Sequence, residues 1–138
     1  MNYFQVMTIK RLLAHNKLYL FLALFWTLLV LLLCLVSVGN LPRLSVKVDS
    51  IDKVVHFTFH FVFVMLWFLY LKEKNIRNVF FKIFLASFSL GVIFVFLQSI
   101  FTVTSQADIK DVLANTTGTI TAITILLLYY KFFKKDIL

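Results

Sequence analysis

Residues 18–38 read LYLFLALFWTLLVLLLCLVSV, and this stretch decides the fold. It has no charged side chain over 21 residues, and about 20 apolar residues are enough for a helix to cross the hydrocarbon of a bilayer. Lys10, Arg11 and Lys17 precede it, as in a signal peptide, but the stretch has no cleavage site of small residues. We therefore predict a retained membrane-spanning helix.

Three further apolar segments follow, at residues 54–71, 83–103 and 112–130. Apolar residues make up 62% of the 138 residues, well above the roughly 45–50% of soluble globular domains. The polar connections at 39–53, 72–82 and 104–111 are short, and short connections make consecutive helices antiparallel neighbours. We predict an all-α fold in which residues 1–138 form a single domain, a four-helix transmembrane antiparallel bundle.

The basic residues predict the orientation of this bundle, because cytoplasmic loops carry an excess of Lys and Arg. The connections at 39–53 and 104–111 are formally neutral when taken together, so the whole net charge of +8 falls on the other side. We therefore expect both termini in the cytoplasm, localisation in the inner (cytoplasmic) membrane, membrane lipids as partners and no nucleic-acid ligand. The ten basic residues on the charged side are Lys10, Arg11, Lys17, Lys72, Lys74, Arg77, Lys82, Lys131, Lys134 and Lys135.

Polar and ionisable side chains gather near the predicted outer ends of the second, third and fourth segments. Such side chains are costly in hydrocarbon, so they usually face the interior of a bundle and mark functional sites. In the second segment, Asp52, His56 and His60 are spaced i, i+4 and i+8, which places them on one helix face over about 12 Å. The side chains predicted to line one outer-leaflet binding pocket are Asp52, Lys53, His56, His60, Gln98, Asp108, Asp111 and Asn115.

Other interpretations of these residues stay open at this point. Asp52 and Asp108 are also suited to cap the starts of helices, and Lys53 to extend toward the lipid headgroups. His56 and His60 are spaced like a pair of metal ligands, but no H-E-x-x-H pattern and no nearby cysteine accompany them. We therefore predict no metal and no cofactor, and we expect the imidazoles to hydrogen-bond to carboxylates of the fourth segment.

The order and spacing of the polar residues resemble the VanZ-like family over nearly the whole chain: Asp52-Lys53-x-x-His56, then Gln98, then Asp108-x-x-Asp111-x-x-x-Asn115-x-x-Gly118. The resemblance implies a four-helix membrane protein of the cell envelope. The namesake of the family is associated with low-level resistance to the glycopeptide teicoplanin.

The chain also departs from the pattern of that family. Val95 stands where the family usually has a glutamate, three residues before the glutamine, and His60 stands where an aromatic residue is common. An arginine commonly precedes the paired aspartates, and the best-aligned positions here are Thr104 and Ser105. These departures predict altered chemistry if the glutamate and the arginine carry it.

Three functions are compatible with this pattern. The first is a binding pocket for an amphiphile, such as a lipid headgroup, a lipid-linked wall precursor or a lipoglycopeptide antibiotic. The second is a hydrolase or transferase for a lipid-linked substrate, with His56 as general base oriented by Asp52 or Asp111, and with no clear nucleophile beyond Thr102, Thr104 and Ser105. The third is a structural accessory subunit whose polar side chains hold the helices together. We favour binding over catalysis, and the oligomeric state stays open.

Overall fold

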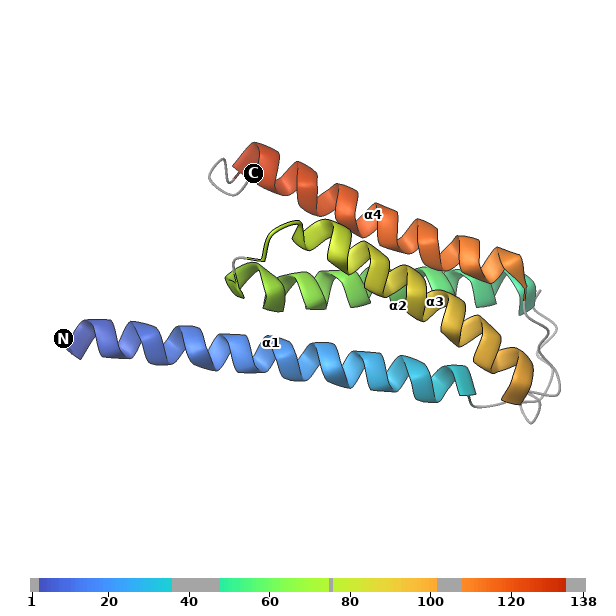
Figure 1. Cartoon of the computed structure of the whole chain (residues 1–138), viewed down its shortest axis with the longest axis horizontal. Helices are drawn as coiled ribbons and strands as arrows, with labels where there is room; N and C mark the ends of the chain where they lie inside the picture. The colour runs from blue at the N-terminus through green and yellow to red at the C-terminus, as the bar shows by residue number, and fades with distance from the viewer. Residues whose placement is uncertain (1–2, 36–47, 75, 102–107, 134–138) are drawn as a thin grey trace.

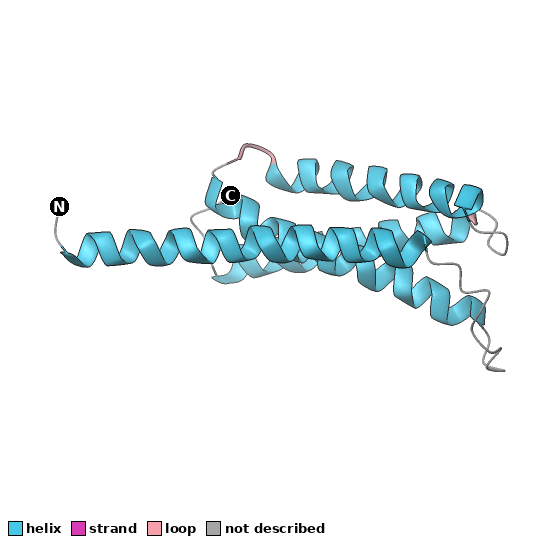
Figure 2. Ribbon diagram, turned by 90° about the horizontal axis from the view of Figure 1, so that it is seen from below, coloured by secondary structure: helices cyan, strands magenta, loops and turns pink. Residues whose placement is uncertain are grey.

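The computed structural model describes residues 3–35, 48–74, 76–101 and 108–133, and its regular elements there are all helical (Figure 1). The helices are α1 (Tyr3–Leu35), α2 (Val48–Leu71), the short 3-10 helix η2 (Lys72–Lys74), α3 (Val79–Phe101) and α4 (Ile109–Phe133). Figure 2 shows the same helices from a direction at right angles to the first. The predicted all-α fold is therefore confirmed.

Each of the four long helices contains a segment that is long and apolar enough to cross a membrane. These segments are His15–Leu33, Ile51–Lys74, Val79–Ile100 and Ile109–Phe133. They identify the chain as a multi-pass membrane protein by length and composition. Helix α1 has 33 residues, about 50 Å at 1.5 Å per residue, so it extends well beyond a hydrocarbon layer of about 30 Å.

All four long helices begin earlier than the hydropathy of the sequence predicts, and α1 begins at Tyr3 instead of residue 18. Helix α2 begins at Val48 instead of residue 54, α3 at Val79 instead of 83, and α4 at Ile109 instead of 112. Apolar runs mark the hydrocarbon-spanning part of a helix, whereas backbone hydrogen bonding continues into the polar headgroup region. As a result Asp52 lies in the second turn of α2, so its interpretation as a helix cap is wrong.

Helix α2 contacts each of the other three long helices, most extensively α4, and in Figure 1 it lies between α1 and α4. Its closest approach is to α4, where Ala114, Gly118 and Ala122 follow at intervals of four residues. Small residues at this spacing let two membrane helices approach closely. A Cβ atom on Gly118 would lie 3.1 Å from the Cα of Phe57 and closer still to its carbonyl oxygen. Only glycine fits at this position.

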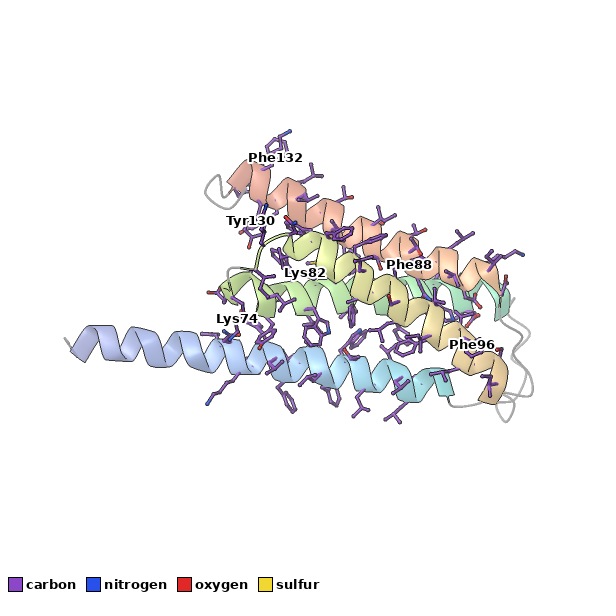
Figure 3. All side chains as sticks on the ribbon, in the orientation of Figure 1. Lys74, Lys82, Phe88, Phe96, Tyr130 and Phe132 are labelled. Atoms are coloured by element: carbon purple, nitrogen blue, oxygen red, sulfur yellow. The ribbon has the colours of Figure 1, made fainter. Side chains whose placement is uncertain are left out.

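Aromatic and aliphatic side chains fill the interior beside this contact. Phe68 stacks on Phe80 with ring centroids 5.0 Å apart and meets Tyr130 edge-on at 5.4 Å. In Figure 3, Tyr130 points toward α2 whereas Phe132, two residues further along α4, points away from the bundle. Phe132 is 71% exposed, as are many other large apolar side chains, and a lipid environment is what covers such a surface.

Two tryptophans attach α1 to α2. The indole Nε1 of Trp26 donates to the carbonyl oxygen of Phe59 at 3.1 Å, and the Nε1 of Trp67 donates to the hydroxyl of Thr27 at 3.2 Å. Both indoles are partly buried, and each satisfies its N–H inside the protein. Helix α1 is therefore held at mid-span by polar as well as apolar contacts.

The Gly118→Ala substitution should destabilise the bundle. The added methyl group would collide with the Phe57 backbone, and overpacking of this kind costs about 1–3 kcal/mol, which outweighs the ~1 kcal/mol that alanine gains over glycine in helix propensity. We expect a lower free energy of unfolding, measured by circular dichroism in detergent micelles.

Gly91→Ala is the matched control, because a Cβ there would meet side-chain atoms of Asn115 and His60 at 3.1–3.2 Å, and side chains can shift. Its loss of stability should be smaller. A Gly118→Ala protein as stable as the wild type would show that α2 and α4 are not packed this closely.

Candidate functional site

An Asp–His–Asp cluster lies where the N-terminal parts of α2 and α4 meet. Asp52 and His56 come from α2 and Asp111 from α4, and their ligating atoms all lie within 4.8 Å of one another. The side chain of Asp52 is 50% exposed, whereas His56 is 4% and Asp111 7% exposed. The cluster therefore has one side open to the surroundings and two groups buried between the helices.

Asn115 fixes the orientation of the His56 ring. The Nδ1 atom of His56 lies 3.1 Å from the Oδ1 of Asn115, and its Nε2 atom lies 3.8 Å from the Oδ1 of Asp52. An amide oxygen can only accept, so Nδ1 carries a proton and donates it to this bond. The Nε2 atom is thereby directed toward the two carboxylates.

Two polar atoms beside this histidine are buried and have no hydrogen-bond partner in the part of the chain that the structure describes. They are the Oδ1 of Asp111 and the Nδ2 of Asn115, one an acceptor and the other a donor. Nearly all buried polar atoms in proteins are hydrogen-bonded, and the exceptions often belong to binding sites. Because Asp111 and Asn115 are one helical turn apart on α4, the two atoms offer a ligand a paired acceptor and donor.

Asp108 and Lys53 border the cluster without belonging to it. The side-chain Oδ1 of Asp108 accepts a hydrogen bond from the backbone N–H of Lys110 at 2.9 Å. The backbone carbonyl oxygen of Asp108 accepts one from the backbone N–H of Asp111 at 3.0 Å. Asp108 therefore caps α4, so this interpretation of the residue is confirmed. Lys53 is half-buried, and both residues lie near enough to Asp111 to interact with it electrostatically.

A second group of polar side chains lies deeper in the bundle and joins three helices. The Nδ1 of His60 on α2 is 2.8 Å from the hydroxyl of Ser87 on α3, which is 2.7 Å from the hydroxyl of Thr119 on α4. Thr119 donates in turn to the carbonyl oxygen of Asn115 at 3.0 Å. We call these residues the inner network. His60, Ser87 and Thr119 are all buried, so they do not face an incoming ligand.

The hydrogen bonds of the two histidines correct one expectation from the sequence. The histidines were expected to hydrogen-bond to carboxylates of the fourth helix, but His56 bonds to the amide of Asn115 and His60 to the hydroxyl of Ser87. Ser87 was missed altogether. Its signal was the i, i+4 stripe Ser87, Gly91 and Val95 on α3, all three of which are buried.

Gly91 of α3 leaves space in the site because it has no side chain. A Cβ atom at this position would lie 3.1 Å from the Asn115 side chain and 3.2 Å from the His60 ring. Val95, at the position of the family glutamate, is only 5% exposed, so an acid there would be buried in the bundle. Gln98 is half-buried on α3 and makes contacts of its own, and its place in the site stays a prediction. Thr102, Thr104 and Ser105 lie outside the described residues.

An apolar groove of about 220 Å³ runs along the surface between α3 and α4. On α4 its lining begins at Ile120, five residues after Asn115, and ends at Thr124. At 1.5 Å per residue, the groove therefore lies about 7 to 14 Å further along α4 than the Asn115 side chain. Its lining is formed by Phe80, Phe81, Phe84, Ile120, Ile123 and Thr124.

Comparison of the chain with protein-family models, with curated proteins and with solved structures finds no match in any of the three.

Proposed function

We propose that this chain is a VanZ-like membrane protein that binds the headgroup of an amphiphilic ligand between the N-terminal parts of α2 and α4. The observation that carries the proposal is the pair of unpartnered buried atoms, Asp111 Oδ1 and Asn115 Nδ2, beside the half-exposed Asp52. A headgroup with hydroxyl or ammonium donors and a phosphate or carbonyl acceptor would satisfy both atoms. In a site of low dielectric such hydrogen bonds are stronger than in water.

The groove between α3 and α4 supports an amphiphilic ligand over a purely polar one. Its six lining residues are apolar apart from Thr124, whose hydroxyl donates to the carbonyl oxygen of Ile120 within the same helix. The groove therefore offers hydrocarbon contacts at the depth where the tail of a bound lipid would run. Lipid-linked cell-wall precursors and lipoglycopeptides share this combination of a polar head and an apolar tail.

Catalysis is the weaker alternative for this site. Among the described residues, the side chains that His56 meets are an amide and a carboxylate, and neither is a nucleophile that a general base would activate. His60 does contact a serine hydroxyl, but Ser87 is fully buried and is also bonded to Thr119. The inner network is better explained as the polar contact that holds α2, α3 and α4 together.

The proposed topology is an antiparallel bundle in the inner (cytoplasmic) membrane, with both termini in the cytoplasm. The order of colours along successive helices in Figure 1 supports the antiparallel arrangement. Lys74 and Lys82 lie at the connection between α2 and α3 in Figure 3, and basic residues favour the cytoplasmic side. This topology places the Asp–His–Asp cluster in the outer leaflet, where an envelope ligand would meet it.

Ligand binding is tested with three probes, phosphatidylglycerol, a polyprenyl phosphate and teicoplanin, added to the purified full chain in micelles. Asp111→Ala and Asn115→Ala should each raise the dissociation constant of the bound probe about 10- to 100-fold. The reason is that a hydrogen bond to a charged group is worth about 1.5–3 kcal/mol and each 1.4 kcal/mol is tenfold in affinity. Equilibrium binding of a fluorescent form of each probe gives the constants.

Thr117→Ala is the control for this experiment, because Thr117 is exposed on the same helix and its hydroxyl donates only to the carbonyl oxygen of Leu113. Its dissociation constant should equal that of the wild type. Failure of all three probes to bind would refute the proposed function. So would dissociation constants of the Asp111→Ala and Asn115→Ala variants that equal the wild-type value.

Topology is tested by labelling single cysteines on intact cells with a maleimide that cannot cross the membrane. In a Cys34→Ser background, Lys110→Cys should react on intact cells, because the connection before α4 is proposed to be external. Lys74→Cys should react only after permeabilisation. Both lysines are exposed, so access to the reagent is matched, and the reverse labelling pattern would overturn the orientation.

A further inference from the structure

We propose that Asp52, His56 and Asp111 bind a divalent transition-metal cation of the Zn²⁺ class. The inference goes beyond headgroup binding and does not depend on it. An imidazole nitrogen and two carboxylate oxygens form a common donor set for this cation. Sites with three protein ligands leave a fourth position for water or an exogenous group.

The spacing of the three groups suits such an ion. The atoms that would bind the ion lie within 4.8 Å of one another. Because the three residues come from two helices, they do not form a sequence motif. Metal–ligand bonds to nitrogen and oxygen are about 2.0–2.2 Å long, so the groups must close by about 1 Å around the ion. Asp52 can supply most of this movement because its side chain is half exposed.

The Asp111 carboxylate provides an independent reason for a cation. Asp111 is more than nine-tenths buried, one of its oxygens has no hydrogen-bond partner among the described residues, and it contributes one of the converging atoms. Burial of an ionised carboxylate is costly unless it is paired or coordinates a metal. A bound cation would remove this cost at a place where the described part of the chain offers no hydrogen-bond donor.

The hydrogen bond between His56 and Asn115 prepares the histidine to act as a ligand. Histidines that bind metals usually donate their other ring N–H to an oxygen acceptor, which fixes the tautomer and the ring orientation. Here Nδ1 donates to Asn115 Oδ1, so the lone pair of a neutral His56 is on Nε2. That lone pair points toward the Asp52 carboxylate at 3.8 Å, an arrangement that a cation between them stabilises.

The surrounding charges also favour a cation. The charged groups near Asp111 are the carboxylates of Asp52 and Asp108, the ammonium of Lys53 and the imidazole of His56. With Asp111 itself, three carboxylates therefore face one ammonium. Such a local excess of negative charge raises the concentration of cations at the mouth of the cluster.

The test is a calorimetric titration of the purified, chelator-treated full chain in micelles with Zn²⁺ alone. We expect saturable binding of one ion per chain. His56→Ala, Asp111→Asn and Asp52→Asn should each weaken binding at least about tenfold. Asn115→Ala should weaken it about 10- to 100-fold, because His56 Nδ1 loses the oxygen to which it donates. Circular dichroism of each variant identifies those that keep the native helical fold.

Two variants serve as matched controls. Asp108→Asn removes the same charge as Asp111→Asn but keeps the capping oxygen of α4, and His15→Ala removes an exposed imidazole from α1. His15→Ala should bind Zn²⁺ like the wild type, and Asp108→Asn should weaken binding far less than Asp111→Asn does. A wild-type chain without saturable binding would overturn the proposal, whatever the variants do. So would equal losses in Asp108→Asn and Asp111→Asn, which would indicate diffuse attraction of cations to the helix ends.

The titration contains none of the three headgroup probes, so its failure is distinct from failure of the headgroup proposal. Exposed Asp52 keeps the test decisive if the variants of buried His56 or Asp111 do not fold. Wild-type affinity in a folded Asp52→Asn protein would contradict the three-ligand site.

Discussion

The contact between Gly118 of α4 and the backbone of Phe57 of α2 is the constraint on which the site depends. It lets two membrane helices approach so closely that no side chain fits between them at that level. His56 directly precedes Phe57, and Asn115 lies three residues before Gly118, so the contact brings these two side chains face to face. In hydrocarbon a polar group without a partner costs several kcal/mol, so this proximity makes a buried histidine and amide tolerable.

Two neighbouring polar groups have different roles, because the side chains of one are hydrogen-bonded to each other and the other keeps buried atoms that are not hydrogen-bonded. In the inner network, the His60, Ser87 and Thr119 side chains bond to one another and to the Asn115 backbone across three helices. Relative to Thr119, Asn115 lies one helical turn and Asp111 two turns closer to the start of α4, and each keeps a buried atom that has no hydrogen-bond partner among the described residues. The first group stabilises the bundle, and the second leaves room for a ligand.

The sequence predicts most of the fold and only part of the site. Four apolar runs predict the four helices, because length and hydropathy are properties of one segment at a time. The i, i+4 spacing of His56 and His60 places both on the buried face of α2, but periodicity does not identify the neighbour that this face meets. Ser87 therefore went unnoticed, since one serine in an apolar helix resembles any other until Thr119 is placed opposite it.

The site requires that α2 and α4 bring His56 and Asn115 into direct contact within the bundle. A double-mutant cycle with His56→Ala, Asn115→Ala and the double variant measures this contact as a coupling in the free energy of unfolding. We predict a coupling of about 0.6–1.7 kcal/mol, the range of hydrogen bonds between membrane helices. Additive single effects, with a coupling near zero, would contradict the account.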